Sequence, residues 1–290
     1  MSTLKRTDFR FFHRMRVRWA EVDMQKIVFN AHYLMYFDTA ISDYWRALCL
    51  PYQDTMDALQ GDLYVVKATV EFHASARVDD QIEVAMKCSR IGSSSMTFTG
   101  AIFRGDEHLI TGEIVYVFAD PTTQKSRPVP QALRDIMLGY EAGEAISTVK
   151  VGPWSTLGPD AQRIRTEVFV QEQRIPKELE WDAADAKAVH AVAYNRLGVP
   201  VATGRYLDKG DGTVKVGRMA VNRVLRGGNL GRDVLHALMQ AAREHGASEV
   251  VLHAQRSAQG FYTRLGFECR GEPFVEAGID HVEMVKAIHP

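Results

Sequence analysis

Between residues 63 and 118, four strand-like runs follow one another without a helical pattern between them. They are 63–72, 81–89, 95–103 and 107–118. One long helical stretch, 32–48, precedes them, with a stripe of apolar residues at spacings of three and four. This stripe comprises Leu34, Phe37, Ile41, Trp45 and Leu48. A strand-like segment at 12–19 and a short helical segment at 131–138 complete this part. A single helix beside an antiparallel meander is an α+β layout, so we expect a sheet that wraps around the long helix.

The pattern changes beyond 139–158, a stretch rich in glycine, proline and small residues. The predicted elements after it are a helix at 159–171, strands at 190–196, 200–207 and 213–221, a helix at 230–245, a strand at 249–254, a short helix at 258–265 and two final strands. Gly246 lies where a glycine commonly ends a helix. We therefore predict two domains, 1–145 and 146–290, the second with a mixed α/β fold.

The composition excludes several classes of protein. The 290 residues are 46% apolar and 24% charged, as in soluble globular proteins. With 35 basic and 36 acidic side chains, the chain is not a polybasic nucleic-acid binder. No stretch reaches the roughly 18 apolar residues of a membrane span. Three separated cysteines and ten scattered histidines form neither a disulfide framework nor a metal-ligand pattern. We expect a cytoplasmic protein that binds no metal and no nucleic acid.

The segment 18–34, RWAEVDMQKIVFNAHYL, places an aspartate, Asp23, between the first strand and the long helix. It resembles the hotdog-fold acyl-CoA thioesterases of the 4-hydroxybenzoyl-CoA thioesterase type, and 77–84 is similar to a strand-entry segment of that family. The resemblance covers about residues 10 to 140. It implies that Asp23 is the catalytic nucleophile or general base, and that an amide around Asn30 stabilises the oxyanion. Thioester hydrolysis needs these two groups and no metal.

Two features of this segment depart from the family's pattern. Lys26 stands where many relatives have glycine, and Asn30 and His32 are exchanged relative to the common order. His32 is either a second polar group at the substrate or a side chain at the helix start. Asp23 has an alternative role as a helix cap. For Glu21 we favour a solvated or ion-paired strand residue.

The segment 217–232, GRMAVNRVLRGGNLGR, follows a predicted strand and opens a predicted helix. It resembles the acetyl-CoA-binding motif of the GNAT N-acetyltransferases, Gln/Arg-x-x-Gly-x-Gly/Ala. Arg226 and Gly231 match its ends, and Asn229, which tolerates a positive φ, replaces the middle glycine. Further motifs of that family are similar to 165–173, to 250–255 with 261–267, and to 274–284. The resemblance spans about residues 155 to 288.

The resemblance implies a set of residues that bind CoA. Backbone groups of Met219 and Val221 would bind the pantetheine arm, and the amides of 226–231, with the Arg226 and Arg232 side chains, would hold the pyrophosphate. The full set is Met219, Val221, Arg226, Gly227, Gly228, Asn229, Leu230, Gly231 and Arg232. A helix N-terminus of this kind is an anion site, because its first amides lack partners.

The amine side of this reaction needs an acid and a base. Tyr262 matches the tyrosine that often protonates the departing thiolate in the family; the alternative is a core aromatic. Candidates for the base or for substrate contacts are Glu172, Glu276 and His281. The acidic run Glu178, Glu180, Asp182 and Asp185 would either attract a cationic amine or form a solvated loop.

Together these patterns predict a bifunctional enzyme, with a thioesterase half that hydrolyses acyl-CoA and an acetyltransferase half that uses acetyl-CoA. Both CoA thioesters are substrates, and we expect no tightly bound cofactor. Hotdog units usually pair, so we expect a homodimer or homotetramer. Two alternatives stay open. The first half could be an inactive dimerising or acyl-CoA-sensing module, or the second half could only bind CoA.

Overall fold

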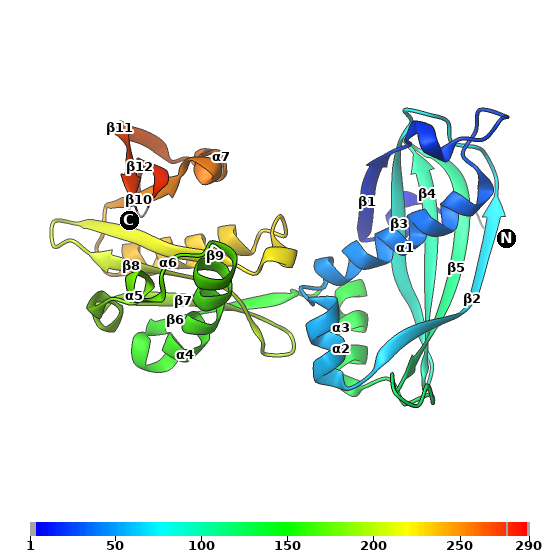
Figure 1. The fold of residues 1–290 in the computed structure, drawn as a ribbon, viewed down its shortest axis with the longest axis horizontal. Helices are drawn as coiled ribbons and strands as arrows, with labels where there is room; N and C mark the ends of the chain where they lie inside the picture. The colour runs from blue at the N-terminus through cyan, green and yellow to red at the C-terminus, as the bar shows by residue number, and fades with distance from the viewer. Residues whose placement is uncertain (1–3, 277, 289–290) are drawn as a thin grey trace. The chain divides into compact units, whose positions relative to one another are not determined.

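A computed structural model describes residues 4–276 and 278–288 of the chain (Figure 1). These residues form two compact units, one ending at Ile146 and the other beginning at Ser147. No helix among the described residues is long and apolar enough to cross a membrane.

The first unit is an antiparallel sheet with one long helix across it. Its elements are β1 (Phe11–Arg16), α1 (Asn30–Ala47), α2 (Tyr52–Leu59), β2 (Asp62–Phe72), β3 (Gln81–Ile91), β4 (Ser95–Arg104), β5 (Glu107–Ala119) and α3 (Gln131–Glu141). The strands lie in the order β1-β3-β4-β5-β2, and Figure 1 shows α1 running diagonally across one face of the sheet. The predicted sheet around a long helix, the hotdog arrangement, is confirmed.

Two glycines let α1 approach this sheet closely. Gly100 of β4 and Gly112 of β5 are paired across the strands, and both face the ring of Phe37. A Cβ at either glycine would lie 2.5 Å from that ring. Phe37 is fully buried as a result. The helix can therefore lie this close to the sheet because Gly100 and Gly112 have no side chains.

The buried face of α1 differs from the predicted stripe at its N-terminal end. Leu34 is 39% exposed, whereas Tyr33 and Tyr36 are buried. The two tyrosines can be buried because their hydroxyls have partners: Tyr33 accepts from the Ala76 amide, and Tyr36 donates to Glu21. An apolar stripe read from spacing alone misses such aromatic residues.

The second unit is a seven-stranded mixed sheet in the order β11-β12-β10-β9-β8-β7-β6. Its strands are β6 (Ser147–Pro153), β7 (Val189–Asn195), β8 (Pro200–Asp208), β9 (Thr213–Val221), β10 (Glu249–Gln255), β11 (Glu268–Glu276) and β12 (Ile279–Ala287). Its helices and turns are α4 (Trp154–Arg165), the π-helical η3 (Thr166–Glu172), α5 (Lys177–Glu180), η4 (Ala183–Lys187), η5 (Arg223–Leu225), α6 (Leu230–Glu244), η6 (Arg256–Ala258) and α7 (Gln259–Arg264). The predicted mixed α/β fold is confirmed.

Helices cover both faces of this sheet. Gly204 of β8 faces Met219 and α6, and a Cβ there would lie 2.4 Å from the Met219 sulfur. The next residue of β9, Ala220, packs instead with Ile164, Val168 and Phe169 of α4 and η3. Because successive strand residues point to opposite faces, α6 lies on one face and α4 with η3 on the other.

One interpretation of the boundary region is wrong. We expected 139–158 to interrupt both folding patterns, but β6 and the start of α4 lie within it. β6 is the last strand in the sheet order and pairs only with β7. Gly152 and Pro153 are tolerated there because an edge strand needs hydrogen bonds on one side only.

Candidate functional site

The loop that carries Asp23 is anchored at its start by a buried carboxylate. Glu21 ends η2 (Trp19–Glu21), is 2% exposed, and accepts hydrogen bonds from the Arg18 amide at 2.7 Å and the Tyr36 hydroxyl at 2.8 Å. The Arg18 guanidinium pairs with the same carboxylate. Although burial opposes it, hydrogen bonds from Arg18 and Tyr36 hold the pKa of Glu21 below its usual value. The ion-paired interpretation of Glu21 is confirmed, in a 3-10 turn and not in a strand.

The loop after Glu21 turns tightly on itself. The Asp23 amide donates to the Ile27 carbonyl, and the Lys26 amide donates to the Asp23 carbonyl, both at 2.9 Å. Lys26 has a φ of +62°, the left-handed conformation that glycine adopts without strain. The lysine therefore adopts the backbone conformation typical of glycine at this position.

The loop ends where α1 begins with free amides. The Phe29 amide donates to the Glu21 carbonyl at 2.9 Å, which closes the loop onto its anchor. Asn30 is the first residue of α1, and no side chain caps this helix. Among the described residues, no backbone partner exists for the amides of Asn30 and Ala31. These amides are suited to bind a developing negative charge.

Asp23 does not cap α1, so that alternative is wrong. Its carboxylate accepts from the Gln25 amide at 2.7 Å, within its own loop. Asp23 is half-buried and Asn30 is exposed, and both belong to the loop that Glu21 anchors. The half-buried His32 packs its ring edge against Phe29, with centroids 6.0 Å apart, as a side chain at a helix start.

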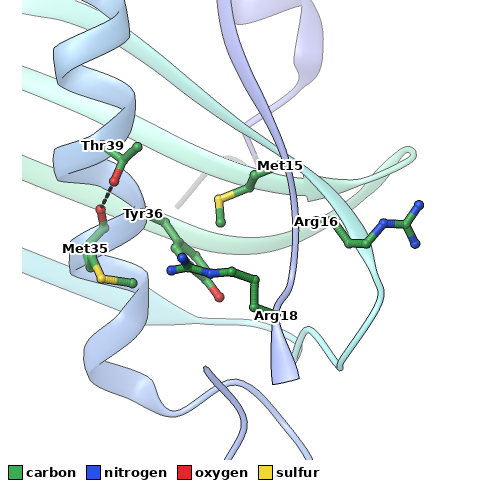
Figure 2. Close-up of a pocket in the computed structure, with 6 residues that line it drawn as sticks. All are labelled: Met15, Arg16, Arg18, Met35, Tyr36 and Thr39. Atoms are coloured by element: carbon green, nitrogen blue, oxygen red, sulfur yellow. Dashed lines mark hydrogen bonds between the residues drawn. The ribbon is translucent and has the colours of Figure 1, made fainter. Parts of the chain in front are cut away.

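A pocket of about 310 Å³ lies between β1 and α1 (Figure 2). It is lined by Met15, Arg16, Arg18, Met35, Tyr36 and Thr39. Arg18 and Tyr36 are the two residues that hold Glu21, so the pocket is connected to the anchor of the Asp23 loop. Sequence patterns did not predict this pocket, because its residues are ordinary strand and helix positions that only the fold brings together.

In the second unit, β9 and β10 separate partway along their length. They pair in parallel from Thr213 with Glu249 to Val216 with Leu252, and no further pair occurs in the described part of the two strands. Just beyond, Arg218 has a φ of +53°. The edge of β9 that carries Met219 and Val221 therefore opens away from β10.

The glycine-rich turn after β9 leads to helix α6. Gly227 and Asn229 have φ of +86° and +70°, so Asn229 adopts the conformation expected of it. The first helical hydrogen bond runs from the Asp233 amide to the Asn229 carbonyl. The amides of Leu230, Gly231 and Arg232 come before it and have no partner within the helix. The Gly228 amide is different, because it donates to Leu225 within the turn. The helix N-terminus presents the three remaining amides to an anion.

The arginines of this turn are ion-paired. The Arg226 guanidinium binds both oxygens of Glu172, at 2.7 and 2.6 Å, and its Nε donates to the Val221 carbonyl at 3.2 Å. Arg232 pairs with Asp233 at 3.0 Å. The hydrogen bonds from Arg226 lower the pKa of Glu172, so this carboxylate is a weaker base than an unpaired one. The structure does not favour Glu172 as the base.

Glu276 belongs to a cluster on β9, β10, β11 and β12. Its Oε2 lies 2.9 Å from Nδ1 of His253, and the Lys215 Nζ lies 3.2 Å from the same nitrogen. Glu283 approaches the other ring nitrogen at 3.7 Å. Burial lowers the pKa of Lys215. His253 and Lys215 were not predicted. The available signal was a polar residue directly after Val250–Leu252 in a buried strand.

His281 and Tyr262 are largely structural in this arrangement. His281 is buried, its Nδ1 lies 2.7 Å from the Ile279 carbonyl, and its ring stacks on Phe274. Tyr262 is 8% exposed, lies against Phe267, and burial raises its pKa to about 12. A phenol with that pKa is a weaker acid than a thiol, whose pKa is about 8.5. The geometry favours the core interpretation of Tyr262.

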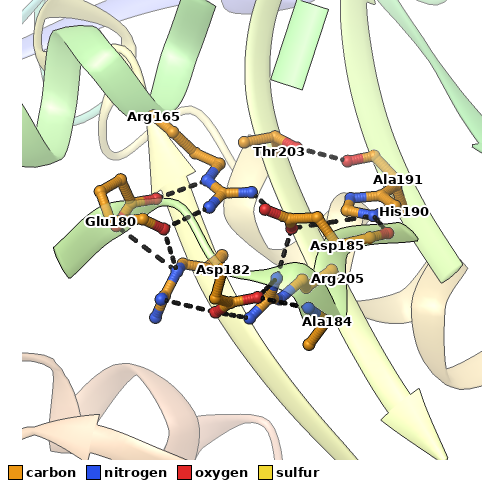
Figure 3. Close-up of polar contacts among 10 residues, drawn as sticks. Arg165, Glu180, Asp182, Ala184, Asp185, His190, Ala191, Thr203 and Arg205 are labelled. Carbon is orange, nitrogen blue, oxygen red and sulfur yellow. Dashed lines mark hydrogen bonds and ion pairs between the residues drawn. The ribbon is translucent and has the colours of Figure 1, made fainter. Parts of the chain in front are cut away.

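The predicted acidic run is neither an amine-binding surface nor a solvated loop. Asp185 is buried and binds both Arg165 and Arg205 (Figure 3). Glu180 is also buried and binds Arg165 at 2.5 Å, and Asp182 binds Arg205 at 2.7 Å. Glu178 and Asp182 of the run are exposed, and Asp182 is held in its ion pair with Arg205. The sequence could not reveal this, because the arginines come from α4 and β8.

Comparison with known proteins agrees with both units. The family described as Acetyltransferase (GNAT) domain matches residues 151–288, and the Thioesterase superfamily matches residues 25–111. No group of three or more metal-ligating side chains occurs among residues 4–276 and 278–288.

Individual relatives match one unit each. The uncharacterized N-acetyltransferase YjcF of Bacillus subtilis is 39% identical over 44% of this chain and 90% of its own length. The acyl-CoA thioester hydrolase YbgC of Escherichia coli is 28% identical over 41% of this chain and 89% of its own length. An acyl-CoA N-acyltransferase structure from Pseudomonas aeruginosa is 31% identical over 49% of this chain and 99% of its own, with a TM-score of 0.44. Through the similarity of its second unit to YjcF and the match at residues 151–288, the chain belongs to the GNAT acetyltransferases, and this unit follows a hotdog domain that resembles the thioesterase superfamily.

Proposed function

We propose that the chain is a bifunctional CoA-thioester enzyme. Its first unit hydrolyses acyl-CoA, and its second transfers the acetyl group of acetyl-CoA to an amine. The observation that carries the proposal is the opening between β9 and β10 beside the free amides of α6. An extended thiol arm fits along an unpaired strand edge, and a pyrophosphate fits a helix N-terminus.

In the acetyltransferase unit, the amides of Leu230, Gly231 and Arg232 would hold the pyrophosphate. The open edge of β9 at Met219 and Val221 would hold the pantetheine arm. Arg226 acts indirectly, because it ties the turn to Glu172 of η3. The turn is thereby preorganised for the anion, which reduces the entropy lost on binding.

In the thioesterase unit, Asp23 would act as nucleophile or general base, and the Asn30 amide as oxyanion donor. Glu21 holds both ends of the loop between them through Arg18 and the Phe29 amide. Support also comes from the similarity to YbgC, an acyl-CoA thioester hydrolase. His32 and the pocket beside Tyr36 are candidates for contacts with the acyl-CoA.

We also propose that the first unit forms a homodimer, as a single pair or within a homotetramer. β2 is an edge of the sheet, is eleven residues long, and exposes Val65 and Val66 at 52% and 60%. A long, exposed, apolar edge strand has free N–H and C=O groups and tends to pair with another strand. A second copy of β2 is the simplest strand to complete it.

The thioesterase proposal is tested by thiol release from acyl-CoAs of increasing chain length. Asp23→Asn should lower the rate about 10²- to 10⁴-fold, because the general base is lost. Asp106→Asn, in an exposed turn of the same unit, is the matched control and should not change the rate. Hydrolysis absent at every chain length would favour the inactive, acyl-CoA-sensing module instead.

The acetyltransferase proposal is tested by CoA release with a panel of amines. Arg226→Glu sets two carboxylates against each other beside the turn and should raise the KM for acetyl-CoA at least about tenfold. Lys209→Glu makes the same charge change in the exposed turn between β8 and β9 and should leave KM unchanged. Acetyl-CoA binding without transfer to any amine would show that this unit only binds CoA.

A further inference from the structure

His253 lies at the point where the acetyltransferase sheet opens. The last β9–β10 pair is Val216 with Leu252, so His253 is the first residue of β10 beyond it. The preceding residues Val250, Val251 and Leu252 are buried, whereas the His253 side chain is 25% exposed. A titratable ring thus stands at the edge of the opening in which the proposed function places the pantetheine arm of CoA.

The ring is on the face of the sheet that carries η3. Gln255, two residues further along β10, donates to the Gln173 side chain at 3.3 Å, directly after η3. Residues two apart in a strand point to the same face, so His253 shares this face. It is the face opposite to α6, whose N-terminus presents the anion-binding amides. His253 is therefore separated from the pyrophosphate site by the sheet.

Neighbouring side chains fix the orientation of the ring. Glu276 of β11 lies 2.9 Å from Nδ1, and the Phe274 ring lies edge-on with centroids 4.8 Å apart. Nδ1 contacts both the Glu276 carboxylate and the Lys215 ammonium group, and a proton on Nδ1 that is bonded to Glu276 leaves Nε2 as the nitrogen that can accept a proton. Such a carboxylate also stabilises the imidazolium that forms when the ring takes a proton.

The charges around the ring come from three strands. Glu276 and Glu283 favour a cationic ring, and Lys215 opposes it. Glu283 is also paired with Arg270 at 2.6 Å, which shares its charge. Hydrogen bonding from His253 lowers the pKa of Glu276 against the effect of burial, so this carboxylate stays ionised beside the ring. His281, the other histidine nearby, is turned to the Ile279 carbonyl.

We propose that His253 is the general base of the acetyl transfer and that Glu276 is its positioning residue, with a primary amine as acceptor. This inference rests on the proposed acetyltransferase activity. The acceptor approaches the ring as an ammonium ion beside the ionised Glu276, and His253 takes one proton from it. The amine nitrogen then attacks the thioester carbonyl carbon, and the C–N bond forms as the C–S bond breaks. The second nitrogen proton goes to the thiolate, so CoA leaves as the thiol, and the imidazolium returns its proton to water.

The test compares His253→Gln and Glu276→Gln with wild type in acetyl transfer to primary amines across pH. His253→Gln should lower kcat/KM about 10²- to 10⁴-fold and remove the rising acid limb of the pH profile. Glu276→Gln should lower kcat less than His253→Gln does, and it should shift the pH at which the acid limb of the profile rises. His236→Gln, on the exposed side of α6, is the matched control and should change neither. Acetyl-CoA affinity, measured by calorimetry, should stay unchanged in all three variants.

The outcomes distinguish the base assignment of His253 from the proposed acetyltransferase activity. If wild type transfers acetyl groups and His253→Gln does so within about threefold with the same pH profile, the base assignment is wrong and the transferase stands. If wild type binds acetyl-CoA but acetylates no amine, both fail together. Imidazole added to His253→Ala should restore part of the rate, which a purely structural role would not allow.

Discussion

At the scale of single residues, burial and ion pairing move the pKa values of two nearby carboxylates in opposite directions. Burial raises the pKa of Glu180, although Arg165 opposes the shift. Hydrogen bonds from Arg205 lower the pKa of Asp182 to about 2. Asp182 is more exposed than Glu180, so burial opposes this shift less. The acidic run therefore contributes to stability through its pairing and is not available to bind an amine.

Asp182 should make the second unit sensitive to acid. Its pKa is about 2 in the folded protein and about 3.9 when unfolded. The stability it contributes is present above pH 3.9 and is lost as the pH falls toward 2. Because the side chain is 37% exposed, we expect only about 1 kcal/mol after solvent screening.

Acid titration of the unfolding free energy checks this. Asp182→Asn should be less stable than wild type at neutral pH, and the difference should vanish near pH 2. Glu268→Gln, an exposed carboxylate on β11, serves as the control and should follow wild type. A difference that persists below pH 2 would assign the effect of Asp182 to something other than its charge.

At the scale of elements, the sequence predicted most helices and strands, since Leu63–Phe118 alternates clearly and Gly246 ends α6 as expected. It missed α2 and β6. The second was hidden by Gly152 and Pro153, which an edge strand tolerates. The candidate sites, like the elements, were predicted only in part. Backbone geometry at Asn229 could be predicted from residue type, whereas the His253 cluster depends on four strands that only the folded sheet brings together.

The ion pairs in Figure 3 connect η4 to α4 and β8, and Asp185 is their common member. Asp185→Asn should lower the free energy of unfolding by about 3–5 kcal/mol, because two buried guanidinium groups lose a shared counter-charge. Chemical denaturation measures the loss. Glu178→Gln, exposed on α5, should stay within about 0.5 kcal/mol of wild type. A loss below about 1 kcal/mol for Asp185→Asn would mean that water screens these pairs.

At the scale of the whole molecule, one chain joins two units, and the proposed function gives each of them a CoA-thioester substrate. The family matches support each unit separately, because the thioesterase match ends at residue 111 and the acetyltransferase match begins at residue 151. On this proposal, a CoA thioester loses its acyl group to water in one unit and to an amine in the other. The edge strand β2 adds an expected self-association of the first unit.

Light scattering or sedimentation should give a dimer or tetramer for wild type. Val66→Lys should shift the protein toward monomer, because a charge on an exposed edge strand opposes strand pairing. Lys67→Arg, which keeps the charge of the next residue, should leave the assembly unchanged. A monomeric wild type would contradict the proposed use of β2.

The central claim is that the chain carries two independent CoA-thioester sites. The most direct measurement is thiol release from acetyl-CoA and longer acyl-CoAs, with and without an amine, in wild type, Asp23→Asn and Arg226→Glu. We predict that Asp23→Asn removes the amine-independent release and leaves the amine-dependent release within about threefold, and that Arg226→Glu does the reverse. Loss of both activities in either variant, or absence of both in wild type, would contradict the account.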